Sequence, residues 1–248
     1  FYFQLAMQRF EEKKLVSASR WMDQYRKSMD YKWLCPKRWK GSEGSCPALS
    51  VIVVTYNRHS ELKNLLEDLQ RQDFKDFEVL VVNNGSPVPD SCQGLADLYI
   101  QCPLNLNLSE GRNIGVYFAQ GQIGVFLDDD ASVESGYLTS IASAFQTYEI
   151  AGMRGKTLPK SKNSGDSDCQ IYNLGDRPFA CLCNQEGNSA FRLDCWRAAG
   201  GMDPLLFGHE GSDLTARLIQ LYGPASVIYW PQAIIYHDYG PTDKAREK

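Results

Sequence analysis

The stretches Ser50-Val-Ile-Val-Val-Thr-Tyr-Asn-Arg58 and Phe126-Leu-Asp-Asp-Asp130 decide the fold of this chain. Each begins with a short run of β-branched or large apolar side chains, which is typical of a buried strand, and each ends in polar residues. Val81-Val-Asn-Asn-Gly-Ser86 repeats this pattern. Because ligands bind at the carboxyl ends of the strands in an open parallel sheet, the three polar clusters are predicted to converge on one crevice.

Helical patterns separate these strands. Ser60 can cap a helix whose leucines at 62, 65, 66 and 69 form one apolar face, and further helices are predicted over 109–119 and 137–148. The resulting β-α-β-α-β-α order predicts an α/β fold, in which a Rossmann-like, mostly parallel central sheet is flanked by helices.

The second half of the sequence is less regular. Residues 154–187 are rich in Gly, Ser, Asn, Asp and Lys and are predicted to be mostly loop with short strands. A helix is predicted over 212–222 with its leucines directed inward, and two strands, 226–230 and 233–236, are predicted to flank Pro231.

Composition and charge bound the class of protein. The 248 residues are 43% hydrophobic and 23% charged, which excludes disorder and a coiled coil as the main identity. No apolar run approaches the roughly 20 residues of a membrane-spanning helix. Residues 1–40 hold ten Lys or Arg and four Asp or Glu, so that a basic arm precedes an acidic body.

The arm and the body are predicted to be separate parts of the chain, 1–45 and 46–248. Apolar residues of the arm recur near a 3.6-residue period and predict a basic amphipathic helix, followed by a linker. Two functions fit such a helix, docking on a membrane surface or on a partner domain. The structural alternative is that the helix packs on its own or a neighbouring domain. We expect no nucleic-acid partner.

The cysteines bear on the compartment. The chain has eight Cys and opens without a secretory signal, so we expect reduced thiols and a protein in the cytoplasm. Peripheral binding to the inner face of the membrane is compatible with this location. Cys169, Cys181, Cys183 and Cys195 form no C-x-x-C pair, which argues against a zinc site.

The triple aspartate 128–130 is the most informative element. Three consecutive carboxylates behind a buried strand are costly unless a cation compensates them. Mg²⁺ and Mn²⁺ prefer such oxygen ligands and often share them with the phosphates of a nucleotide. The alternative is a solvated acidic turn that caps the next helix. No P-loop or G-x-G-x-x-G pattern is present, which argues against kinase-type and dinucleotide-binding proteins.

The chain resembles the family 2 glycosyltransferases, which have the GT-A fold. The resemblance covers about residues 48–240 and leaves out 1–45. Its motifs occur in the family's order: Ser50-Val-Ile-Val-Val-Thr-Tyr-Asn-Arg58, Val81-Val-Asn-Asn-Gly-Ser86, Gly111-Arg-Asn-Ile-Gly115, Phe126-Leu-Asp-Asp-Asp130, and Gly200-Gly-Met-Asp203 running into His209-Glu-Gly-Ser-Asp213.

The resemblance implies a set of contacts to a nucleotide sugar. They come from the ends of the first three strands and from the start of one helix: Thr55, Tyr56, Asn57, Asn84, Arg112, Asn113, Asp128 and Asp129. Asn84 would pair with the base edge, although the family often has an Asp at this point of the sequence. Arg112 and Asn113 would lie near the ribose or the diphosphate, and holding the sheet edge is the alternative role for Asn113.

The resemblance also implies a metal site. Asp130 is expected to bind Mn²⁺ or Mg²⁺, with Asp128 as the second choice, while the earlier carboxylate helps to fix the ribose. His237 follows a predicted strand and matches a position where related enzymes place an imidazole on the metal. A structural role is the alternative for a lone histidine.

The expected catalytic base departs from the family pattern. The family commonly reads Glu-Asp-x-Asp at the start of a helix, and Gly211 stands where the second carboxylate is expected. Glu210 is then the first candidate and Asp213 the second, with helix capping as the alternative role of Asp213. Asn188 and Arg192 are expected in the pocket for the acceptor and the donor sugar, with a packing role as the alternative.

The implied reaction moves a sugar from a nucleotide diphosphate, with UDP as the expected nucleotide, to an acceptor hydroxyl with inversion. The acceptor would be a saccharide, a glycoprotein or a lipid-linked molecule in polysaccharide or glycoconjugate synthesis. A glycoside hydrolase needs no metal and diphosphate site. A nucleotidyltransferase needs a basic loop after its first strand, which is missing. The alternative from another class is an inactive domain that binds the nucleotide sugar or docks on a partner.

Overall fold

The computed structural model describes residues 30–40, 46–86, 92, 94–160, 172–206 and 208–238. The chain divides into two compact units, 1–33 and 34–248. The helix predicted for the arm falls on residues before 30, outside the described residues. The fold and the site below belong to the second unit.

One ten-stranded sheet forms the centre of this unit, in the order β1-β4-β3-β2-β5-β9-β7-β10-β6, with β8 paired to β10. The strands are β1 (Lys37–Arg38), β2 (Leu49–Thr55), β3 (Phe77–Asn83), β4 (Leu98–Gln101), β5 (Ile123–Asp128), β6 (Ser132–Val133), β7 (Gly152–Leu158), β8 (Phe179–Ala180), β9 (Asn188–Arg192) and β10 (Val227–Tyr236). Neighbours among β4, β3, β2 and β5 are parallel, as are β7 and β10. β9 runs antiparallel between β5 and β7.

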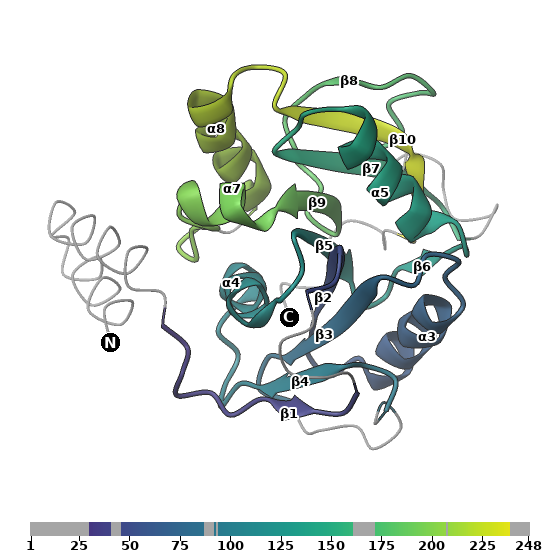
Figure 1. Ribbon diagram of the computed structural model, residues 1–248. Helices are drawn as coiled ribbons and strands as arrows, with labels where there is room; N and C mark the ends of the chain where they lie inside the picture. Colours follow the sequence, from purple (N-terminus) through teal and green to yellow (C-terminus); the bar gives the residue numbers. More distant parts are fainter. Residues whose placement is uncertain are drawn as a thin grey trace, which may run out of the picture. The chain divides into compact units, whose positions relative to one another are not determined.

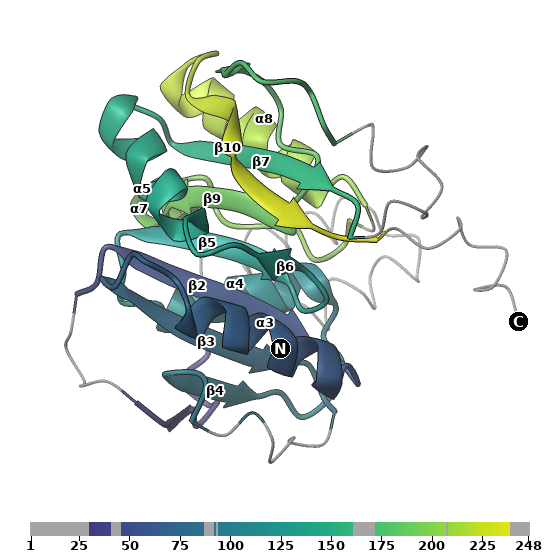
Figure 2. The same cartoon turned by 90° about the vertical axis from the view of Figure 1, so that its right-hand side faces the viewer.

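Helices cover both faces of the sheet, as Figures 1 and 2 show for α3 and α4 on opposite sides of β2 and β3. The helices are α3 (His59–Gln70), α4 (Leu108–Phe118), α5 (Tyr137–Thr147), α7 (Leu193–Ala198) and α8 (Glu210–Tyr222). The predicted α/β fold with a mostly parallel central sheet is thereby confirmed.

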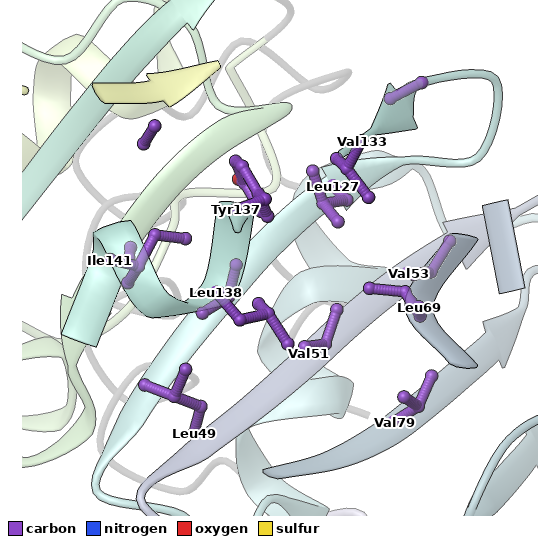
Figure 3. Packing of buried hydrophobic residues seen from close by; sticks show 14 of the residues in the cluster. Leu49, Val51, Val53, Leu69, Val79, Leu127, Val133, Tyr137, Leu138 and Ile141 are labelled. Atoms are coloured by element: carbon purple, nitrogen blue, oxygen red, sulfur yellow. The ribbon is translucent and has the colours of Figure 1, made fainter. Parts of the chain in front are cut away.

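The two faces of β2 are packed in different ways. On one face Val51 and Val53 join a core with Leu69 of α3 and Leu138 of α5 (Figure 3). On the other face two glycines of α4 let the helix approach the strand closely, and a Cβ at position 111 would lie 2.6 Å from Val54 Cγ1. This close contact brings the first turn of α4 to the carboxyl end of β2.

The second half of the sheet departs most from the sequence prediction. The predicted loop over 154–187 contains most of β7, whose residues are buried although their composition is polar. Lys156 of this strand is compensated by Asp176, with 2.5 Å between Lys156 Nζ and Asp176 Oδ1. The two strands predicted around Pro231 are one strand, β10, whose register shifts between Tyr229 and Ile234.

Three smaller expectations were wrong. Ser60 does not cap α3, because the N-cap is Arg58 and the Ser60 hydroxyl bonds Glu61. Leu221 of α8 is exposed rather than directed inward. β4 has no counterpart among the predicted strands, since its four residues make too short a run to show a period.

The end of the predicted arm belongs to the sheet. Lys37 and Arg38 pair with β4, and Trp39 stacks on Tyr99 with 4.7 Å between ring centroids. The second compact unit accordingly begins at Leu34, before the expected boundary at 45. The division of the chain into an arm and a catalytic domain stays a prediction.

Two further observations concern the compartment and the membrane. The seven cysteines for which the structure gives a state, all but Cys169, are free thiols. Within the described ranges, no helix combines the length and the hydropathy that a passage through a bilayer requires.

Candidate active site at the carboxyl edge of the sheet

The three polar clusters meet at the carboxyl edge of β2, β3 and β5. In the register of the sheet, Val54 lies opposite Asp128, and Thr55 lies opposite Asn83. The backbone N–H of Asn84 donates to the carbonyl oxygen of Thr55 across 2.8 Å and continues the pairing past the strand ends. The predicted convergence is confirmed.

Asp129 is buried at this edge and links Thr55 to Arg58. Its Oδ2 accepts a hydrogen bond from Thr55 Oγ1 at 2.8 Å, and its Oδ1 lies 3.3 Å from Arg58 Nη1. Burial raises the pKa of Asp129 to about 6, and the hydroxyl and the guanidinium offset only part of this effect. With both oxygens engaged, Asp129 positions Thr55 and Arg58, whereas the sequence predicted that it contacts the nucleotide sugar.

Asp130 joins three elements that are distant in the sequence. Its Oδ1 lies 2.9 Å from Nε2 of His237 after β10, and its Oδ2 forms an ion pair with Arg58 before α3. Burial would raise the pKa of Asp130, but the hydrogen bond and charge of His237, together with Arg58, outweigh it and hold the pKa below its usual value. Burial would lower the pKa of His237, but the facing carboxylate raises it by more.

The pair of Asp130 and His237 fits two ligands of one divalent cation. A carboxylate and an imidazole suit Mn²⁺, and neighbouring ligands about 2.1 Å from an ion at right angles lie about 3 Å apart, as these atoms do. In the part of the chain that the structure describes, no three His, Cys, Asp or Glu side chains gather closely enough to complete a site. The remaining ligands would have to come from a phosphate group and water.

Asp128 lies between α4 and the loop before β9. Its Oδ1 is 3.1 Å from Nη2 of the buried Arg112. Its other oxygen rests against the backbone of Gly187, where no side chain has room. The carboxylate remains partly exposed, so Arg112 holds it in place at the edge of the site. The expected contact of Arg112 with the ribose or the diphosphate stays a prediction.

The expected base-binding residues divide into two groups. Tyr56 and Asn57 follow β2 and are exposed, with Asn57 at a φ of 57°. Asn84 is buried, and its side chain is used within the protein: Nδ2 donates to Asn105 Oδ1 and the Asn107 carbonyl, and Oδ1 accepts from the Leu106 backbone. Asn84 therefore orders the loop before α4 and does not present its amide to a base.

Two other expected contacts, Asn113 and Asn188, hold the structure together. Asn113 Nδ2 donates to the carbonyl oxygen of Met202, and its Oδ1 accepts from the Met202 N–H, both at 2.9 Å. Asn188 is fully buried and bonds Tyr137 and two backbone carbonyls. These contacts fit the alternative roles of the two residues, packing for Asn188 and holding the sheet edge for Asn113.

Arg192 lies at the opposite edge of the sheet. It pairs with Ile123 at the start of β5, about 16 Å along the strand from Asp128 at roughly 3.3 Å per residue. Its guanidinium donates to the carbonyl of Ile150 at 3.0 Å. Because β9 runs antiparallel to β5, Arg192 lies far from the aspartates, and its position fits the packing role that was the alternative.

The start of α8 carries the two expected base candidates. Asp213 is paired with Arg217, one helical turn later, at 3.1 Å from its Nε. Glu210 Oε1 accepts a hydrogen bond from Ser109 Oγ of α4 at 3.3 Å. A carboxylate that was not expected, Glu186, accepts the backbone N–H of Gly211 at 2.6 Å.

Sequence reasoning missed Arg58 and Glu186. The signal for Arg58 was its position directly after the first predicted strand. A basic residue there can neutralise the carboxylates that follow the neighbouring parallel strand, β5. Glu186 had no local signal, because only the tertiary structure brings the loop before β9 to the start of α8.

A fold of this kind with acidic and basic groups at the carboxyl edge is typical of glycosyltransferases with the GT-A fold. Residues 50–172 match the family model described as "Glycosyl transferase family 2", and this match places that part of the chain in the family. The expected family is confirmed.

Curated relatives agree with this family. A β-1,3-glucosyltransferase of Campylobacter jejuni, named for GalNAc(5)-diNAcBac-PP-undecaprenol, is 38% identical over 103 residues, which are 38% of this chain and 33% of that protein. The uncharacterised glycosyltransferase YwdF of Bacillus subtilis is 32% identical over 150 residues, which are 58% of this chain and 53% of that protein. The chain thus spans about a third to a half of these relatives.

Solved structures share the fold at low sequence identity. The mannosyltransferase PcManGT from Pyrobaculum calidifontis, solved with GDP-Man and Mn²⁺, has a TM-score of 0.65 at 16% identity, covering 98% of this chain and 70% of that one. A fragment of Staphylococcus aureus TarS, solved with UDP-GlcNAc, has a TM-score of 0.65 at 17% identity. The match covers 81% of this chain and 61% of the TarS fragment.

Proposed function

We propose that this chain transfers a sugar from a nucleoside diphosphate sugar to an acceptor hydroxyl, in the synthesis of a polysaccharide or glycoconjugate. The observation that carries the proposal is the meeting of Asp128, Asp130, Arg58 and His237 at the carboxyl edge of the sheet. The family match and the relatives named as glycosyltransferases support the same reaction.

Residues at the ends of β2 and β5 would hold the donor. Thr55 and Arg58 are fixed by Asp129, and the exposed Tyr56 and Asn57 stand beside them, where a base and ribose can lie. Arg112 fixes Asp128 at the other side of the edge. UDP is the nucleotide that we propose first, since a neighbour in fold was solved with UDP-GlcNAc.

Asp130 and His237 would hold Mn²⁺ or Mg²⁺, with Asp128 nearby. The cation would supply Lewis-acid stabilisation of the departing diphosphate. Arg58 already neutralises part of the charge on Asp130 and Asp129, and it can turn toward a phosphate when the donor binds. The neighbours solved with Mn²⁺ support a metal in this fold.

The acceptor would enter from the side of α8. A carboxylate there would take the proton of the attacking hydroxyl, and attack opposite to the diphosphate inverts the anomeric carbon. The sequence makes Glu210 and Asp213 candidates for the catalytic base, and Asp213 forms an ion pair with Arg217. A saccharide, glycoprotein or lipid-linked acceptor would suit this reaction. The name of one relative contains an undecaprenol-linked molecule, and we propose the cytoplasmic face of a membrane as the location.

A second candidate function is a domain that binds the nucleotide sugar without transferring it. The observation that favours it is Gly211, which leaves the start of α8 without a side chain at the expected position of the base.

Thermal unfolding with a panel of UDP and GDP sugars, with and without Mn²⁺, tests donor binding, because a ligand of the folded state raises the midpoint temperature. We expect one donor to raise it only when Mn²⁺ is present, and Asp130→Ala to abolish the shift. Transfer to saccharide and undecaprenyl-linked acceptors separates the two candidates. Donor binding without transfer would favour the non-catalytic domain, and no shift with any donor would contradict both.

A further inference from the structure

Glu186 occupies the space that Gly211 leaves open. Its Oε1 accepts the N–H of Gly211 at 2.6 Å, in the first turn of α8. A Cβ at position 211 would lie 2.7 Å from Glu186 Cγ and 2.8 Å from its carboxyl carbon. Contacts below 3 Å between such atoms do not persist, so a side chain at 211 and the present position of Glu186 exclude each other.

The loop that carries Glu186 also touches the donor side of the site. The next residue, Gly187, lies directly against the Asp128 carboxylate, and the hydroxyl of Ser189 donates to the Glu186 carbonyl at 2.8 Å. Since Gly187 lies against Asp128 and Glu186 accepts the Gly211 N–H, this loop links the proposed donor site to the first turn of α8.

The three carboxylates near α8 are not equally available to accept a proton. Asp213 is held by the Arg217 guanidinium through Oδ2. Glu210 accepts from the Ser109 hydroxyl. Among the described residues, Oε2 of Glu186 and Oε2 of Glu210 both lack a hydrogen-bond partner, and both side chains are half-buried. Glu186 differs from Glu210 because it fills the space beside Gly211, where the family pattern places the base.

We propose that Glu186 is the catalytic base of the transfer, supplied from the loop before β9 in place of a side chain at 211. The acceptor oxygen forms a bond to the anomeric carbon of the donor sugar, and its proton goes to Glu186 Oε2. The bond from the anomeric carbon to the diphosphate oxygen breaks, and its electron pair leaves with the diphosphate. The Gly211 N–H holds the carboxylate in this orientation before the reaction.

This inference rests on the proposed transferase function. A merely structural Glu186 would cap α8 by accepting the Gly211 N–H. Glu186→Gln separates the two roles, because a glutamine oxygen still accepts this hydrogen bond but takes no proton at neutral pH. We expect transfer to fall by about 100- to 10,000-fold, the usual contribution of a general base. The dissociation constant of the donor with Mn²⁺ should change by less than about twofold, because the base does not hold the nucleotide.

A rescue experiment tests the shared space directly. Glu186→Ala should lower transfer as strongly as Glu186→Gln. The double variant Glu186→Ala/Gly211→Asp places a carboxylate in the same space from α8, and we expect it to recover at least about tenfold over Glu186→Ala. Gly211→Asp alone should lower the midpoint temperature, since both carboxylates would compete for one position. Glu149→Gln, an exposed glutamate after α5, is the matched control and should match the wild type.

The outcomes separate this inference from the proposed function. A wild-type chain that binds and transfers a donor, with Glu186→Gln equally active, overturns Glu186 as the base and leaves the proposed function standing. Loss in Glu186→Gln together with rescue by the double variant supports the base. Loss without rescue, combined with a lowered midpoint temperature in Glu186→Gln, assigns Glu186 to capping and overturns the inference. A wild-type chain that binds no donor overturns the proposed function itself.

Discussion

The two halves of the sheet use their polar residues for different purposes. Polar residues after β2 and β5 lie at one edge, where Thr55 and Arg58 contact Asp129 and Asp130. Polar residues of β7 and β9 turn inward: Asn188 bonds Tyr137, and Lys156 is paired with Asp176.

The difference follows from strand direction. Neighbouring parallel strands have their carboxyl ends at the same edge of the sheet, so the residues that follow these strands gather there. β9 is antiparallel to its neighbours, so its first residue lies near that edge and its last lies at the opposite one. Polar residues inside such a strand must find partners in the core, because burial without them is costly.

The largest expected effect is at Asp130. Asp130→Ala removes the carboxylate that His237 and Arg58 share. Loss of a residue that only supports a metal ligand lowers activity by about 10- to 100-fold, so loss of a proposed ligand should lower transfer by more than this. Steady-state transfer with Mn²⁺ measures this. Arg192→Ala, from the opposite edge, should retain transfer. Equal losses in the two variants would contradict the division of the sheet into two halves.

Asn188→Ala should act on stability. It leaves the buried Tyr137 hydroxyl and two carbonyl oxygens without their partner, at a cost of about 3 kcal/mol in the free energy of unfolding. Urea titration followed by circular dichroism measures the change. Gln146→Ala, an exposed position of α5, should cost less than about 0.5 kcal/mol. An unchanged stability in Asn188→Ala would show that its polar contacts are not structural.

Gly115→Ala tests the approach of α4 to β2. An added methyl group would collide with Ile52 and push the helix from the strand, so we expect a loss of about 2 kcal/mol. Gly136→Ala, where an added methyl group meets open space, should lose less than about 1 kcal/mol. The same titration compares both variants, and similar losses would mean that the close contact is relieved without cost.

The effect that is smallest per pH unit concerns Glu110 at the start of α4. Burial raises its pKa to about 8, so between about pH 4.5 and 8 the folded state binds more protons than the unfolded state. The free energy of unfolding then falls as pH rises, by at most about 1.4 kcal/mol per pH unit from this group. Stability of the wild type and Glu110→Gln, measured from pH 5 to 8, should converge at low pH. Parallel curves would exclude a buried, titrating Glu110.

The sequence predicted the first half of the fold well because local signals were strong there. The leucines of α3 form one buried face, and β2, β3 and β5 end where the polar clusters of the sequence begin. Their direction followed from the helices between them, so the positions of Thr55 and the aspartates could be inferred.

The second half was predicted poorly because its structure depends on distant partners. β7 is polar and buried, and Lys156 becomes acceptable there only through Asp176 from a later loop. No local pattern in the sequence predicts that β9 is antiparallel to β5 and β7. This strand direction determines where Arg192 lies. The contact of Glu186 with Gly211 also joins segments that only the folded chain brings together.

The most direct test of the account is where a nucleotide and its cation bind. Paramagnetic Mn²⁺ in the presence of UDP broadens the amide NMR signals of residues close to it. We expect the signals of Asn57, Asp130, Gly187 and His237 to broaden strongly, and those of Ile150 and Arg192, at the opposite edge, to stay sharp. Broadening centred on the opposite edge, or none at any edge, would contradict a nucleotide-sugar site at the carboxyl ends of β2 and β5.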